Sequence, residues 1–175
     1  MTCSCKQKST LKIKKLREGV QDVAYGSELA SGFDVRAYAC ELYNIHTKET
    51  EPLPLEDLNG KKGWFIEPNT TVLFKTGLAM ACGENEEIQV RARSGFSLKS
   101  PMRVSNGIGT LDADYRGEVG IIMDNNGEYG LWFVPYEERV AQLVVCPVIR
   151  PTIKYVEDLD ETDRGEGGFG STGMQ

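Results

Sequence analysis

The sequence contains a single histidine, His46, in 175 residues. A Ser-His-Asp triad needs a histidine beside its serine, and zinc centres use several histidines or cysteines. The five cysteines are odd in number and scattered, and only Cys3 and Cys5 lie close together. Cys146 lies in an apolar run, which predicts a small core residue. These scarcities argue against a catalytic triad and a zinc site, and they favour a reduced, cytoplasmic setting.

Long apolar runs and an excess of positive charge are also missing. No stretch approaches the roughly 20 apolar residues of a membrane span, and the first residues lack the apolar core of a secretory signal. The net charge of −6 disfavours a broad surface for DNA or RNA. We therefore expect neither a membrane nor a nucleic acid as a partner. A local cationic pocket is still compatible with the sequence, because five basic residues fall close together: Arg91, Arg93, Lys99, Arg103 and Arg116.

Length and composition fit one globular domain followed by an arm. The hydrophobic fraction of 40% and the charged fraction of 26% are ordinary for a chain with a proper core. We predict one β domain over residues 1–156, in which the polar residues 41–62 form a surface insertion. Residues 157–163 carry five acidic side chains and predict a solvated, extended tether. Residues 157–175 are thus predicted to be this tether and a glycine-rich lid.

Short apolar stretches of strand length are abundant, and glycine and asparagine turns separate them. Alternation in residues 71–76 and 87–92 predicts half-buried strands. The turns at residues 105–107 and 125–127 predict two hairpins, each between the strands that flank it. Short helical turns are predicted after Arg93, at residues 94–98, and around residues 55–58. The pattern indicates an all-β sandwich or barrel-like domain with very little helix.

Candidate chemistry concentrates between Arg91 and Asp124. Arg93, Ser94 and Gly95 place a guanidinium, a hydroxyl and an unhindered backbone N–H side by side, which is a compact phosphate clamp. Further along, a carboxylate at Asp112 could accept a proton from water, and Tyr115 could stack on a sugar or base. The segment around Asp112 also fits a solvated acidic turn.

Half of the ten residues from Arg164 to Gly173 are glycine. Such a segment has little side chain to bury, but it offers free backbone N–H groups, two hydroxyls, an arginine and an aromatic ring. That inventory suits a lid over a phosphate-bearing ligand with a flat base. A frayed terminus is the alternative interpretation.

Five segments, taken in order, resemble the five motifs of the trimeric dUTP diphosphatases, and they suggest a phage or bacterial member. The resemblance covers residues 31–173 apart from 41–62. Three positions depart from the usual motifs, and all lie beside the chemical groups: Val35, Ala92 and Glu137. The segments are Ser31-Gly-Phe-Asp34-Val, Ala92-Arg-Ser-Gly-Phe96, Asn106-Gly-Ile-Gly-Thr-Leu-Asp112-Ala-Asp-Tyr115-Arg-Gly, Arg139-Val-Ala-Gln142-Leu and Arg164-Gly-Glu-Gly-Gly-Phe169-Gly-Ser-Thr-Gly.

The resemblance implies a jelly-roll-like distorted barrel that hydrolyses dUTP to dUMP and pyrophosphate. Asp112 would be the general base for a water that attacks the α-phosphorus. Tyr115 would pack on the deoxyribose and leave no room for a 2′-hydroxyl. The residues that read uracil would be Asn106, Gly109, Thr110, Leu111 and Gly120.

The resemblance also implies how the phosphates are held. Arg93, Ser94 and Gly95 would bind them, with support from Gln142. From the lid, Arg164 would meet the terminal phosphates, Phe169 would stack over uracil, and Gly170 would also bind the substrate. Mg²⁺ is expected on substrate phosphates and water, with Asp34 reaching it through water and no direct protein ligand. The assembly would be a homotrimer whose sites are shared between subunits.

Two other functions are compatible with the same fold. One is dCTP deamination, alone or combined with dUTP hydrolysis, which would need a group that activates water at C4 of the base. The other is a non-catalytic nucleotide-binding regulator that contacts a protein partner through residues 41–62. The segment from Asp112 to Tyr115 and the complete glycine-rich tail favour the diphosphatase.

Overall fold

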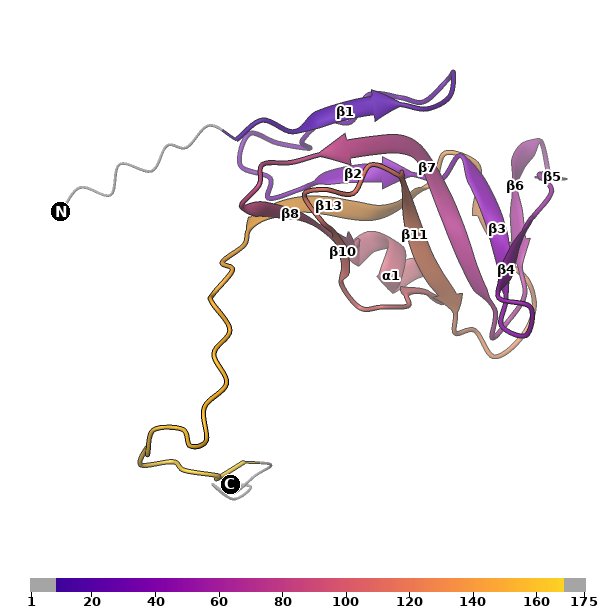
Figure 1. Cartoon of the computed structure of the whole chain (residues 1–175). Coiled ribbons are helices and arrows are strands. Elements are labelled where there is room, and N and C mark those ends of the chain that lie inside the picture. The colour runs from indigo at the N-terminus through magenta and orange to yellow at the C-terminus, as the bar shows by residue number, and fades with distance from the viewer. Residues whose placement is uncertain (1–8, 169–175) are drawn as a thin grey trace.

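The structure, a computed structural model, describes residues 9–168, and within them one short helix accompanies thirteen strands (Figure 1). The strands form three antiparallel sheets that pack around one core. The predicted all-β, jelly-roll-like fold is confirmed. Within the described residues, no helix is long and apolar enough to cross a membrane.

The largest sheet has six strands in the order β4-β3-β7-β11-β9, and β1 also pairs with β7. Its central strand β7 alternates buried and half-buried residues up to Thr76, which gives the sheet an inner and an outer face. The strands are β1 (Lys12–Lys15), β3 (Ala39–Asn44), β4 (Glu49–Pro52), β7 (Thr71–Ala81), β9 (Met102–Val104) and β11 (Glu118–Asn125).

A four-stranded sheet in the order β10-β8-β13-β2 packs against the first. Its strands are β2 (Phe33–Arg36), β8 (Glu86–Ala92), β10 (Gly109–Leu111) and β13 (Arg139–Pro147). The third sheet has the order β12-β6-β5, with β5 (Glu56–Leu58), β6 (Lys61–Ile66) and β12 (Trp132–Pro135). The helix α1 (Ser94–Lys99) follows β8 after Arg93, as the sequence predicted.

Side chains from all three sheets meet in the core. Trp64 of β6 and Phe74 of β7 are fully buried, with their ring centroids 5.8 Å apart. Ile121 of β11 and Leu143 of β13 are also fully buried and belong to the same cluster. Each such side chain stabilises the fold by roughly 1.5–3 kcal/mol relative to exposure. The sheets that carry the functional residues are therefore fixed to one another.

Both predicted hairpins are wrong, although the first of the two turns exists. The turn at residues 105–107 connects β9 with β10, which lie in different sheets. Residues 126–131 connect β11 with β12, and these strands also belong to different sheets. The local turn chemistry sets where the chain reverses, whereas the core decides which strand each segment pairs with. The first of these crossings opens the space that becomes the candidate site.

Other segments also differ from their predicted form. Residues 56–58 are strand β5 and not a helical turn, because they pair with β6. Cys146 is only half-buried, since it lies opposite Glu87 on the outer face of β13, where it accepts a hydrogen bond from Arg91 at 3.4 Å.

Two segments lie at the periphery of the domain. Within residues 41–62, strands β4 and β5 are fully exposed, and each lies at the edge of a sheet. Residues 150–166 are exposed, and the chain leaves the domain in this region (Figure 1). The predicted boundaries of an insertion at 41–62 and of an arm from residue 157 remain predictions.

Asn125 joins the sheets at the end of β11, and its replacement should destabilise the protein. Its side chain is fully buried, donates to the carbonyl of Ile66 at 2.9 Å and accepts from the N–H of Gly127 at 3.0 Å. Asn125→Ala leaves both partners unpaired, which should lower the free energy of unfolding by about 1–3 kcal/mol. Urea denaturation measures this loss. Asn126→Ala, at the exposed neighbour, is the matched control and should change stability by less than about 0.5 kcal/mol. Equal effects of the two changes would contradict this role of Asn125.

Candidate active site

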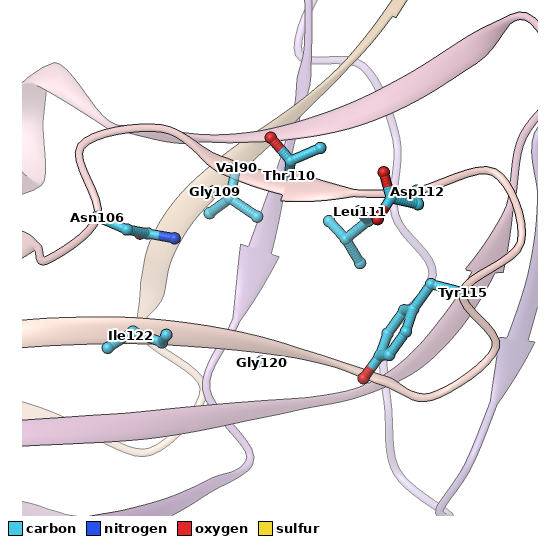
Figure 2. A pocket seen from close by; sticks show the side chains of 9 residues that line it. All are labelled: Val90, Asn106, Gly109, Thr110, Leu111, Asp112, Tyr115, Gly120 and Ile122. Carbon is cyan, nitrogen blue, oxygen red and sulfur yellow. The ribbon is translucent and has the colours of Figure 1, made fainter.

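A cleft of about 200 Å³ lies between β10 and β11, where the two large sheets diverge (Figure 2). Its volume is below the roughly 300–1,000 Å³ typical of sites for drug-sized ligands, so it fits a base and part of a sugar better than a whole nucleotide. Seven of the nine lining residues are those predicted from the sequence: Asn106, Gly109, Thr110, Leu111, Asp112, Tyr115 and Gly120.

The wall of the cleft above β11 is the edge of a sheet. Strand β10 pairs with β8 through Gly109↔Val90 and Leu111↔Ile88, and no other described strand pairs with it. The backbone N–H and C=O groups of its second edge are therefore available to a ligand. Asn106 closes one end, and its side-chain nitrogen leaves little space for any side chain at Gly109. A planar ligand with donors and acceptors along one edge suits this wall.

Asp112 follows β10 directly and lines the cleft. Its carbonyl accepts a hydrogen bond from the backbone N–H of Tyr115 at 3.1 Å, which closes the turn that carries both residues. Asp112 also lines a neighbouring cavity of about 600 Å³ with Asp114 and Arg116. Its exposed carboxylate therefore lies at the junction between a small cleft and a wider polar space, in reach of water.

The ring of Tyr115 closes the end of the cleft nearest Asp112 (Figure 2). Its hydroxyl donates to the backbone carbonyl of Glu118 at 3.1 Å, so the ring is held at both ends of the side chain. Gly117 makes this position possible, because any side chain at Gly117 would overlap the Tyr115 hydroxyl. Tyr115 as a whole is still 45% exposed, so part of its surface is accessible to a ligand.

A second group of polar side chains surrounds Arg93, beyond the other end of β8. The Nε of Arg93 lies 2.9 Å from one oxygen of Asp34, and Nη1 of Arg139 lies 3.1 Å from the other. Arg93 also donates from Nη1 to the carbonyl of Arg139 at 2.7 Å. Asp34 thus fixes two guanidinium groups side by side. Ser94 and Gly95 follow directly in α1.

Gln142 belongs to this second group. It lies on β13 opposite Asp34 on one side and Arg91 on the other. Its side-chain amide donates to the carbonyl of Ala92 at 2.9 Å, which turns it toward the start of the Arg93 segment. The residues of the β domain that were predicted to hold phosphates are therefore gathered in one place. Arg139, which belongs to the fourth motif but was not predicted as a phosphate ligand, adds a second cation. We call Arg93 and Arg139, with Asp34 between them, the arginine cluster.

The cleft and the arginine cluster are separated within one chain. Leu111, just before Asp112, pairs with Ile88, and the five positions from Ile88 to Arg93 span roughly 17 Å. The side chain of Arg93 also points toward Asp34 and Arg139, on the side of β8 away from β10. The carboxylate and the guanidinium of one chain therefore face different spaces.

The predicted lid residues are not brought to either group. Arg164 is exposed and donates from Nε to the carbonyl of Gly167 at 2.6 Å, in the arm that leaves the domain (Figure 1). Phe169 and Gly170 lie outside the described residues. Val90 and Ile122 also line the cleft, although they were not among the predicted site residues. Ile122 could have been predicted, because the alternation that places Gly120 on the outer face of β11 also places Ile122 there.

The described residues offer no ready-made metal cage. Within residues 9–168 no three His, Cys, Asp or Glu side chains are grouped to hold a metal ion. Both oxygens of Asp34 are bonded to arginines. This donor set fits a magnesium ion that is held by phosphates and water, which is how Mg²⁺ commonly binds with nucleotides.

Comparisons with known proteins identify the family. The dUTPase family model matches residues 57–173. The deoxyuridine 5′-triphosphate nucleotidohydrolase of Syntrophotalea carbinolica is 40% identical over 165 residues, which cover 94% of this chain and 97% of the relative. That of Bdellovibrio bacteriovorus is 42% identical over 168 residues, which cover 95% and 98%. The chain belongs to the dUTPase family.

Solved structures with the same fold include dUTPases of Staphylococcus phages. The phage 80alpha dUTPase with dUpNHpp has a TM-score of 0.71 and 24% identity, and the match covers 94% of this chain and 99% of that one. A variant of the phage phi11 enzyme, solved with a structural Mg(II) ion, has a TM-score of 0.67 and 21% identity, with coverages of 85% and 97%. At these identities the likeness supports the fold.

Proposed function

We propose that the cleft between β10 and β11 is where this dUTPase hydrolyses dUTP to dUMP and pyrophosphate. Asp112 takes a proton from a water molecule, whose oxygen bonds to the α-phosphorus as the bond to the α–β bridging oxygen breaks. The observation that carries the proposal is the placement of Asp112 and Tyr115 on one hydrogen-bonded turn at the mouth of a small cleft.

Uracil would be read by the free edge of β10. The backbone groups of residues 109–111 offer donors and acceptors in a fixed order, which suits the edge of a pyrimidine. The small volume of the cleft disfavours the extra methyl group of thymine. Tyr115 would pack on the deoxyribose, so that a 2′-hydroxyl would meet the ring. Selection for the base and for the sugar would thus come from different walls of the same cleft.

The phosphates would be held by the arginine cluster of a neighbouring copy in a homotrimer. Asp112 and Arg93 of one chain lie roughly 17 Å apart, and the Arg93 side chain points away from the cleft. These two observations support the arrangement, because the two side chains of one chain cannot reach the same phosphate group. Arg93, Ser94 and Gly95 would contact the phosphates, with Ser94 near the bridging oxygen where charge develops. Gln142 would support the phosphate and water network.

Mg²⁺ and the arm would complete the site. The metal would neutralise phosphate charge while bound mainly to phosphate oxygens and water. Asp34 would reach it only through water, because its oxygens already bind Arg93 and Arg139. Residues 157–175 would act as tether and lid, with Arg164 at the terminal phosphates and Phe169 and Gly170 over the base.

Replacing Asp112 by asparagine should retain dUTP binding and remove most turnover. The amide keeps the shape of the side chain but cannot take the proton, and general-base catalysis is typically worth about 10²–10⁴-fold in rate. Single-turnover kinetics with dUTP, together with a binding titration, measure the two effects separately. Turnover near that of the unmodified enzyme would exclude Asp112 as the base. Following ammonia as well as pyrophosphate would reveal any deaminase reaction.

Replacing Tyr115 by alanine should weaken the preference for dUTP over UTP. Without the ring, a 2′-hydroxyl no longer meets a barrier, so the ratio of the two kcat/KM values should fall by about tenfold or more. Asp114→Ala is the matched control, because Asp114 lies on the same turn and lines the neighbouring cavity but not the cleft. An unchanged ratio in Tyr115→Ala would place the barrier elsewhere.

A further inference from the structure

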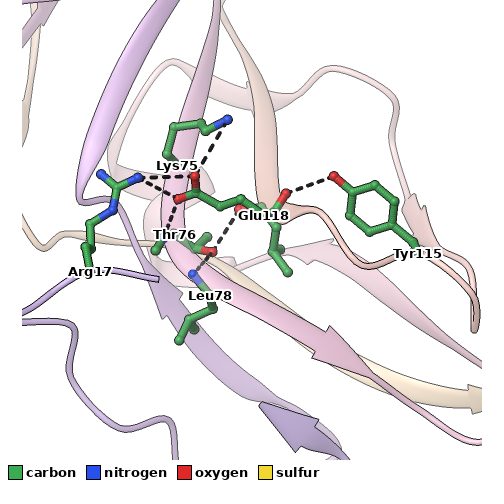
Figure 3. Close-up of polar contacts among 8 residues, drawn as sticks. Arg17, Lys75, Thr76, Leu78, Tyr115 and Glu118 are labelled. Carbon is green, nitrogen blue, oxygen red and sulfur yellow. Dashed lines mark hydrogen bonds and ion pairs between the residues drawn. The ribbon is translucent and has the colours of Figure 1, made fainter. Parts of the chain in front are cut away.

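The residue that accepts the hydrogen bond from the Tyr115 hydroxyl is Glu118, and the side chain of Glu118 contacts distant parts of the chain. The Tyr115 hydroxyl donates to the backbone carbonyl of Glu118, the first residue of β11 (Figure 3). The position of the ring therefore depends on where the first residue of β11 lies. The contacts of the Glu118 side chain help to fix that position.

The Glu118 carboxylate is only 15% exposed and has three partners (Figure 3). The backbone N–H of Gly77 donates to it at 2.7 Å. Nη2 of Arg17 donates to both of its oxygens, at 2.9 and 3.1 Å. The ammonium of Lys75 lies 3.7 Å away. Hydrogen bonds between charged groups that are partly shielded from water are stronger than those of an exposed surface pair.

The regular strand ladder is interrupted at this point. The pairing of β11 with β7 shifts from Glu118↔Ala79 to Gly120↔Lys75, which is a β-bulge. Within the bulge, the hydroxyl of Thr76 donates to the carbonyl of Val119 at 2.8 Å. The start of β11 is therefore held in part by side-chain contacts and not by the ladder hydrogen bonds alone.

Gly77 allows Arg17 to reach Glu118. Its φ of +68° favours glycine, and a side chain at this position would overlap Val20 and the stem of Arg17. Arg17 follows β1 closely, and the N–H of Leu16 donates to the carbonyl of Gly77 at 2.8 Å. The segment after β1 thus lays the Arg17 side chain across β7 and onto the first residue of β11.

We propose that Glu118 and Arg17 are positioning residues for the sugar-selecting ring of Tyr115. Arg17 holds the Glu118 carboxylate, the carboxylate fixes the start of β11, and the carbonyl of the same residue orients the Tyr115 hydroxyl. Neither Arg17 nor Glu118 lines the cleft, so they act only through Tyr115. The inference rests on the proposed role of Tyr115 as the barrier to a 2′-hydroxyl.

The test is the ratio of kcat/KM for dUTP to kcat/KM for UTP in Arg17→Met. This change keeps most of the apolar stem and removes both hydrogen bonds to Glu118. The ratio should fall by about three- to tenfold, because a charge-assisted contact is lost and the ring is less confined. Loss of folded enzyme lowers both kcat/KM values equally, so it leaves the ratio unchanged. Lys15→Met is the matched control, since it removes an exposed pair with Asp22 on the same segment and should keep the ratio.

Two further variants keep the test decisive if Arg17→Met folds poorly. Arg17→Lys retains the charge, but its shorter side chain places the charged group less well on Glu118, so it should give an intermediate ratio. Tyr115→Phe removes the hydroxyl, so adding Arg17→Lys to it should lower the ratio no further. Additive effects, or an unchanged ratio in both Arg17 variants, would overturn the inference. If Tyr115→Ala also leaves the ratio unchanged, the proposed barrier itself is wrong; if only the Arg17 variants do, the barrier stands and its support lies elsewhere.

Discussion

Strand β8 is the element on which the arrangement of the candidate site depends, because its two edges pair with strands that carry different groups of candidate residues. One edge carries β10, which leads to Asp112, and the other carries β13, which bears Gln142 and begins at Arg139. The strand register places Asp112 and the arginine cluster at opposite ends of β8, roughly 17 Å apart. A strand in the middle of a packed sheet cannot slide to close that distance, because a slip of one residue would turn every buried side chain outward. This separation is the reason that we propose a site completed by a second copy of the chain.

Two irregular features of the fold lie around the cleft. The chain crosses between sheets at the turn from β9 to β10, and this crossing leaves one edge of β10 free to face a ligand. The bulge at Glu118 interrupts the neighbouring strand, where Tyr115 needs a fixed acceptor. The large buried side chains of the three sheets keep these irregular segments in place.

The sequence predicted which residues line the cleft better than it predicted the path of the chain. Asp112, Tyr115 and residues 109–111 lie within one short stretch of sequence, so a local motif contains all of them. In the structure they line one cleft. The two hairpins were wrong because strand partners are chosen by the core, which local turn chemistry does not report. The contact between Arg17 and Glu118 joins residues 101 positions apart, and no local pattern points to it.

The most direct test of a site shared between copies mixes two defective variants. Asp112→Asn lacks the base and Arg93→Ala lacks the phosphate contact, so each should be nearly inactive alone. If equal amounts of the two variants are unfolded together and refolded as mixed trimers, about a quarter of the sites should combine an intact Asp112 with an intact Arg93 from the neighbouring copy. Activity should then return to about that fraction of the unmodified enzyme. Mixed trimers that are detected by mass and remain as inactive as their components would contradict the account.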